Sequence, residues 1–163
     1  MFLINSKTVN EINTKMFYGW IIVLIGGLGI FSSGAGQSHT FSAFLPIIIK
    51  ELNISSTSLS TAYMIATLFA AFLLPRMGKL VDKFGPRIVL IVTIIFLGFG
   101  CLLFGAASNF FMLALGFGFL RFFGQGSLML CSSNIVTQWF DKKRGFALGL
   151  MGLGFAISMG LHP

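Results

Sequence analysis

The side chains of this chain that could do chemistry are few, and they lie inside or beside long apolar runs. Arg121 lies near the middle of a run from Phe110 to about Val136. An arginine at the centre of a bilayer costs about 2.5–3.5 kcal/mol on insertion scales, so it should face protein or a water-filled cavity. It is therefore a candidate for substrate binding or proton coupling. The alternative is a structural arginine that donates hydrogen bonds to backbone carbonyls between helices.

Other polar side chains near apolar runs are weaker candidates for the same roles. Gln37 and His39 belong to a small, polar segment at 32–40, and Gln125 and Asn134 lie on the same run as Arg121. The imidazole of His39 could carry protons; alternatively it lies at the outer membrane interface or packs between helices. No His/Asp/Glu cluster suggests an enzyme, and no Cys spacing suggests a metal. We therefore expect neither catalytic residues, nor a metal, nor a cofactor.

The elements that must position these side chains are membrane-spanning helices. The chain has 163 residues, of which 56% are hydrophobic and 9% charged, whereas soluble domains carry about 25% charged residues. The twenty Gly and twenty Phe suit an α-helical bundle in lipid. The sequence thus predicts an all-α polytopic membrane protein. The expected spans are 17–50, 57–75, 88–107, 110–137 and 145–161.

The first of these spans is too long for one crossing of the bilayer. It should project beyond the membrane, or bend at Gly34–Gly36 or at Pro46. In the fifth span, Gly152, Ala156 and Gly160 form a stripe of small residues that predicts close helix contact. Cys101 and Cys131 lie within apolar runs and are expected to be inert.

The distribution of lysine and arginine predicts the orientation of the chain. With residues 1–15 as a cytoplasmic tail, one side of the membrane holds nine basic residues and the other side holds Lys50 alone. This bias predicts a multi-pass cell-membrane protein with a cytoplasmic N-terminus. The net charge of +7 does not indicate nucleic acid, because the basic residues fill the gaps between apolar runs. The nine residues are Lys7, Lys15, Arg76, Lys79, Lys83, Arg87, Lys142, Lys143 and Arg144.

A charged loop is expected at 76–87, between the second and third spans. Gly78 is expected at the end of the second span and Gly85-Pro86 just before the third, since glycine suits a helix stop and proline a helix start. On physical grounds the segment is a basic cytoplasmic turn. Its spacing, G-x-x-x-D-K-x-G-P-R, also resembles the signature between the second and third helices of the major facilitator superfamily of secondary transporters. The matching residues are Gly78, Leu80, Asp82, Lys83, Gly85 and Arg87, whereas Pro86 replaces a usual basic residue.

This resemblance implies a function for the loop and an architecture for the chain. The loop would be a conformational latch, in which Asp82 stabilises the outward-open state by contacting a helix end beyond residue 163. The chain would form the first five transmembrane helices of a twelve-helix fold. It would be incomplete, lacking a C-terminal half needed for function, so that residues 1–163 alone would not transport.

Further segments resemble one branch of the superfamily. The segment from Arg121 to Gly126 is similar to the superfamily's fourth-helix arginine pattern. Tyr18-Gly19-Trp20, Gly85-Pro86-Arg87 and the segment 139–149 look like the monocarboxylate and oxalate/formate transporters. The implied function is alternating-access transport of small organic anions, by symport or antiport, with protons as possible coupling ions. The alternatives are a sugar or drug carrier of the same superfamily, and a truncated membrane protein that does not transport.

Overall fold

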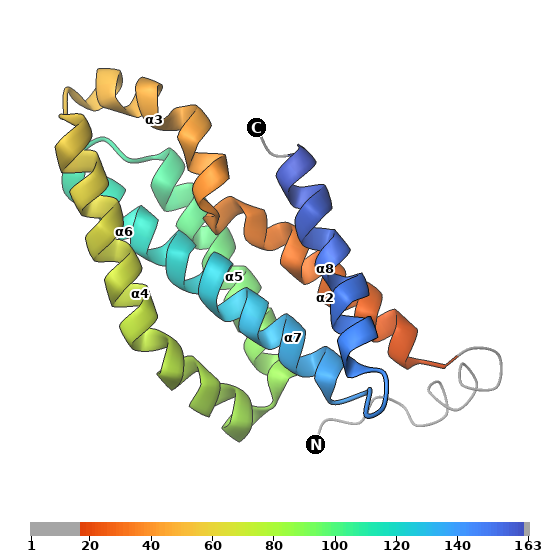
Figure 1. The fold of residues 1–163 in the computed structure, drawn as a ribbon. Coiled ribbons are helices and arrows are strands. Elements are labelled where there is room, and N and C mark those ends of the chain that lie inside the picture. Colours follow the sequence, from red (N-terminus) through yellow and green to blue (C-terminus); the bar gives the residue numbers. More distant parts are fainter. Residues whose placement is uncertain (1–16, 162–163) are drawn as a thin grey trace.

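The computed structural model describes residues 17–161, and these residues form a bundle of helices (Figure 1). Five helices are long and apolar enough to cross a membrane. The prediction of an all-α polytopic membrane fold is confirmed. The expected tail at 1–15 lies outside the described residues.

The first span is bent in its middle. It consists of α2 (Gly19–Ser32), the 3₁₀ turn η1 (Ser33–Gly36) and α3 (Ser38–Leu52). Gln37 is extended, with φ −89° and ψ 152°, and this residue separates η1 from α3. Pro46 lies inside α3. Of the two bend sites considered from the sequence, the small and polar one at Gly34–Gly36 is where the α-helix is interrupted, and α3 leans across the end of the bundle (Figure 1).

The second and third spans are joined by a single residue. They are α4 (Ser56–Phe84) and α5 (Pro86–Gly105), and Gly85 between them has φ 83°. The loop expected at 76–87 is therefore helical except at Gly85. The basic residues Arg76, Lys79 and Lys83 are good helix formers and favour this continuation, and the Gly85 N–H still donates to the Val81 carbonyl at 2.9 Å.

The fourth span contains a π-helix at its centre. It consists of α6 (Phe110–Phe119), the π-helix η2 (Leu120–Leu128) and α7 (Met129–Thr137). The Asn109 side chain caps α6 by accepting a hydrogen bond from the Met112 N–H at 2.9 Å. A π-helix of this kind is rare and is often found at functional sites.

The fifth span, α8 (Arg144–Leu161), follows a short basic connection at 138–143. Arg144, the first residue of α8, holds this connection by donating to the Phe140 carbonyl at 2.7 Å and pairing with Asp141 at 3.2 Å. The connection lies at the same end of the bundle as the junction of α4 and α5, the lower end in Figure 1. We call this end the basic end. Its described basic residues are Arg76, Lys79, Lys83, Arg87, Lys142, Lys143 and Arg144.

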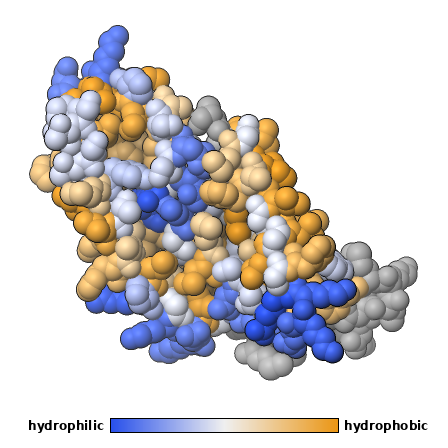
Figure 2. Space-filling model, in the orientation of Figure 1, coloured by the Kyte–Doolittle hydropathy of each residue, from blue (hydrophilic) through white to orange (hydrophobic). Residues whose placement is uncertain are grey.

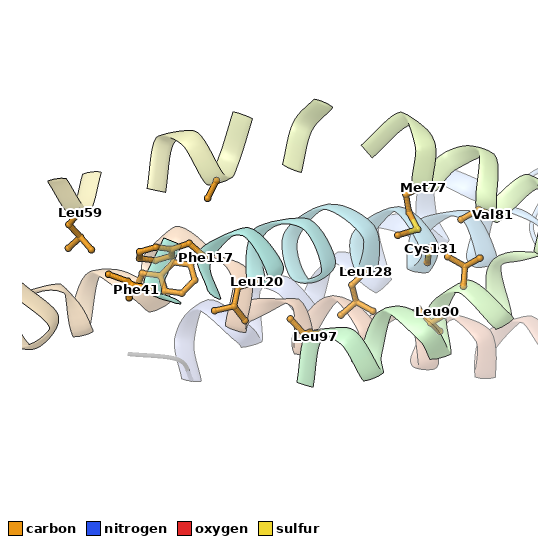
Figure 3. Packing of buried hydrophobic residues seen from close by; sticks show 13 residues of the cluster. Phe41, Leu59, Met77, Val81, Leu90, Leu97, Phe117, Leu120, Leu128 and Cys131 are labelled. Atoms are coloured by element: carbon orange, nitrogen blue, oxygen red, sulfur yellow. The ribbon is translucent and has the colours of Figure 1, made fainter. Parts of the chain in front are cut away.

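The fourth span packs on both sides and forms the centre of the bundle. One buried cluster joins it to α4 and α5, as Figure 3 shows for Leu97, Leu128 and their neighbours. A second cluster joins α7 to α2 and α8 through residues such as Ile22, Val136 and Met151. Two apolar seams thus hold the outer helices against one central helix.

The contact of α8 with α2 uses a different face from the one that the sequence predicts. A Cβ on Gly152 or Gly160 would meet no atom within 4 Å, and Ala156 is exposed. Within residues 17–161 this stripe therefore makes no close helix contact. The buried face instead carries Ala147, Met151 and Ser158, and Gly154 lies so close to α2 that a Cβ would overlap the Gly27 carbonyl oxygen.

Candidate functional site

The guanidinium of Arg121 contacts three residues from two parts of the bundle, the helix α4 and the 3₁₀ turn η1. Its Nε donates to Thr67 Oγ1 at 3.1 Å, and its Nη1 donates to the Gly36 carbonyl at 3.3 Å. Its Cζ lies 4.8 Å from the centre of the Tyr63 ring. The residue is only 9% exposed. Arg121 therefore faces protein. The cation–π contact with the Tyr63 ring and the two hydrogen-bond acceptors fix its position.

Arg121 has no negative partner among the described residues. The acidic residues of this part of the chain are Glu51, Asp82 and Asp141, and the sole ion pair within residues 17–161 joins Asp141 to Arg144. The two acceptors of Arg121 are neutral oxygens. A buried cation without a counter-ion is costly and favours a bound anion.

The Arg121 side chain lines a cavity of about 500 Å³. Most of the wall is aliphatic, and its polar members are Arg121, Gln125, Thr67 and Ser133. The Gln125 Oε1 is buried without a hydrogen-bond partner. Figure 2 shows hydrophilic atoms along the middle of one face, between apolar flanks. The aliphatic wall is completed by Ile30, Ala70, Ala71, Leu74, Met129, Leu130 and Met151, with Gly126.

The site depends on a close crossing of the first and fourth spans. A Cβ on Gly36 would overlap the Leu120 carbonyl oxygen and would lie 2.8 Å from the backbone nitrogen of Gln125. A Cβ on Gly124 would lie 3.1 Å from the Gly36 Cα. Two glycines thus let the 3₁₀ turn η1 touch the π-helix η2. This crossing brings the Gly36 carbonyl within reach of Arg121.

The five candidate residues from the sequence are not brought together. Arg121 and Gln125 line the cavity. Gln37 is buried, and its Nε2 lies 3.6 Å from the Met129 sulfur. His39 packs edge-on against Phe155, with ring centres 6.2 Å apart, and its Nε2 is buried without a hydrogen-bond partner. Asn134 lies near the basic end and accepts a hydrogen bond from Gln138 at 2.8 Å.

Two residues of the site, Tyr63 and Thr67 in α4, were not predicted from the sequence. Their spacing of four residues places them on one face of a helix, and a tyrosine and a threonine in an apolar run could have suggested a polar face. The Tyr63 hydroxyl also shares a hydrogen bond with Ser38, at the start of α3.

The motif residues at the basic end are not part of this cavity. Asp82, Lys83 and Leu80 are exposed, and a Cβ on Gly78 would meet no atom within 4 Å. Asp82 has no ion-pair partner among the described residues. Arg87, half-buried at the start of α5, completes the motif beyond Gly85.

Comparison with known proteins identifies the family. The model of the Major Facilitator Superfamily matches residues 20–163. The chain belongs to this superfamily. It is a family of transporters and not of enzymes, and the expected superfamily is therefore confirmed.

Several curated members of the Major Facilitator Superfamily are similar to this chain. The multidrug resistance protein MdtG of Proteus mirabilis is 34% identical over 77% of the chain and 32% of its own length. The MFS transporter asaE of Aspergillus flavus is 27% identical over 90% of the chain and 30% of its own length. An uncharacterized MFS-type transporter, YhjX of Escherichia coli, is 28% identical over 82% of the chain and 34% of its own length.

The chain thus spans about a third of the length of these Major Facilitator Superfamily relatives. No solved structure matches it. These relatives are named as multidrug or other superfamily transporters, and none of the three is named as a monocarboxylate transporter.

Proposed function

We propose that the full-length protein is a secondary active transporter that moves small organic anions, in particular monocarboxylates, by alternating access. The observation that carries the proposal is Arg121, a buried cation without a described counter-ion at the wall of a mostly aliphatic cavity. A carboxylate would complement the guanidinium through charge-assisted hydrogen bonds. A short hydrocarbon body would fit the aliphatic wall.

The proposal extends to the orientation and the moving parts of the protein. We infer a cell-membrane protein with a cytoplasmic N-terminus, because the basic end of the bundle would then lie in the cytoplasm. Asp82 would act as a latch toward a helix end beyond residue 163, and symport or antiport would follow from the two halves rocking around the central site. Gln125 and His39, each with a buried unpartnered atom, are the candidates for further substrate or proton contacts.

A second candidate is a drug carrier of the same superfamily. The mostly aliphatic lining of the cavity and the similarity to a protein named for multidrug resistance favour it. The two candidates differ in what Arg121 does. A carboxylate substrate needs its charge, whereas a hydrophobic drug without negative charge does not.

Uptake by the full-length protein in proteoliposomes tests the proposal. Labelled acetate, pyruvate and lactate are compared with a neutral sugar and a cationic dye. Arg121→Gln should reduce carboxylate uptake at least about 10-fold, since a hydrogen bond to a charged group contributes about 1.5–3 kcal/mol. Lys142→Gln, an exposed change at the basic end, should leave uptake unchanged. Carboxylate uptake no faster than in empty liposomes would refute the proposal, and dye uptake that survives Arg121→Gln would establish the drug carrier.

A further inference from the structure

One face of α4 changes from apolar to basic along its length. Its apolar part is strongly exposed, with Phe72 at 72% and Leu68 at 64%, and exposed basic residues follow from Arg76 to the end of the helix. We call this face the α4 stripe. It consists of Ile65, Leu68, Phe69 and Phe72, followed by Arg76, Lys79 and Lys83.

The helical geometry places these seven residues on a single side. At about 100° per residue they fall within an arc of about 100°. The buried residues Ala70, Met77 and Val81 lie on the far side of the helix. Gly78, Leu80 and Asp82 fall outside the arc, so Lys83 is the one residue that the stripe shares with the motif.

The basic residues of the stripe have no carboxylate partner among the described residues. The Arg76 Cζ lies 5.6 Å from the centre of the Phe72 ring, and the Lys83 Nζ lies 5.2 Å from that of Phe84. The Arg76 charge therefore lies over an exposed ring at the border between apolar and basic surface, and the Lys83 charge lies over an exposed ring at the end of the helix. Such a border resembles the level at which the acyl chains of a bilayer meet the headgroups.

The length of α4 agrees with this level. The helix has 29 residues and is about 43 Å long, whereas the hydrocarbon core of a bilayer is about 30 Å thick. Part of the helix must therefore lie outside the hydrocarbon core, and the charged last turns with Arg76, Lys79 and Lys83 are the part that suits the headgroup region. The basic part of the stripe would then face phosphate groups, and the apolar part would face acyl chains.

We propose that the α4 stripe is a binding site for an anionic phospholipid such as phosphatidylglycerol. Arg76, Lys79 and Lys83 bind the headgroup phosphate, and the acyl chains lie along Ile65, Leu68 and Phe72. The net charge of the site selects the lipid, because a zwitterionic phospholipid brings no net negative charge to three cations. The proposal needs only a membrane around the helix and does not depend on the transported substrate.

Lipid retention by the full-length protein tests this site. The protein is reconstituted in nanodiscs of phosphatidylcholine with a minor fraction of phosphatidylglycerol, and the retained lipids are counted by native mass spectrometry. Lys79→Gln/Lys83→Gln should bind phosphatidylglycerol about 30-fold more weakly, equivalent to about 1 kcal/mol for each cation near an anionic surface. The matched control, Lys142→Gln/Lys143→Gln, removes the same charge from the other basic connection and should retain the lipid. Helix content by circular dichroism shows that both variants are folded.

The outcomes separate a lipid from the other possible occupants. Equal retention in the two double variants would overturn the proposal, because the stripe would then be covered by protein or act only through bulk charge. Displacement of the lipid by millimolar glycerol 3-phosphate would also overturn it, since a free anion would then suffice. Selective loss in Lys79→Gln/Lys83→Gln, with no displacement by glycerol 3-phosphate, is the expected result.

Discussion

Gly154→Ala should weaken the contact between α8 and α2, whereas Gly152→Ala should not. At Gly154 a Cβ would overlap the Gly27 carbonyl oxygen, and the Gly27 Cα would lie 3.2 Å away. These are backbone atoms, so a change of side-chain rotamer cannot relieve the overlap. At Gly152, two residues along the same helix, a Cβ would meet nothing within 4 Å.

The magnitude follows from comparing the two variants. Alanine raises intrinsic helix stability by up to about 1 kcal/mol over glycine at either position. Overpacking typically costs about 1–3 kcal/mol, and it applies at Gly154 alone. The free energy of unfolding of Gly154→Ala should therefore be about 1–3 kcal/mol below that of Gly152→Ala.

Equilibrium unfolding in mixed detergent micelles, followed by circular dichroism, measures this difference. Gly152→Ala serves as the matched control for helix propensity and for the added methyl group. Equal unfolding free energies for the two variants would refute the reasoning, because α8 would then not approach α2 at Gly154. A larger loss at Gly152 would place the contact on the stripe of small residues after all.

The remaining predictions concern the support of Arg121 and one helix cap. Tyr63→Leu should cost about 0.5–2 kcal/mol more unfolding free energy than Tyr63→Phe, because the phenylalanine keeps a ring under the guanidinium; equal losses would contradict this. Thr67→Val should lower the free energy of unfolding by about 1–3 kcal/mol, because it leaves the Arg121 Nε without its acceptor. Thr67→Ser keeps a hydroxyl acceptor and should lose much less, and thermal unfolding of the two variants measures the difference. Asn109→Ala should cost about 1 kcal/mol through loss of the α6 cap, and Ser108→Ala, measured in the same way, should be neutral.

The spans could be predicted from the sequence because length and hydropathy define them directly. The ends of the spans that carry charged residues could not be predicted in this way. Arg76 and Lys79 suggested a loop, yet a basic side chain at the membrane surface does not end a helix, and α4 continues to Phe84. The packing face of α8 was missed for a geometric reason. Residues spaced strictly by four drift by about 40° per step, whereas the buried Ala147, Met151 and Ser158, with Gly154, alternate steps of four and three.

The candidate site could be predicted only in part. A lone arginine in an apolar run is conspicuous, and Arg121 was found for that reason. Its partners were not, because Thr67 and Gly36 are 54 and 85 residues away in the sequence and nothing local connects them. The π-helix η2 likewise has no clear sequence signal, although it places Arg121 and Gln125 on the wall of the same cavity.

The hydrogen bonds of Arg121 have a consequence for how the chain is made. Both acceptors, the Gly36 carbonyl and Thr67 Oγ1, precede Arg121 in the sequence, as does the Tyr63 ring. During synthesis from the N-terminus, the first two spans leave the ribosome before the fourth. A guanidinium entering the lipid then meets acceptors that are already in place, which offsets part of the cost of inserting it. The order of the helices along the chain is therefore also a workable order of assembly.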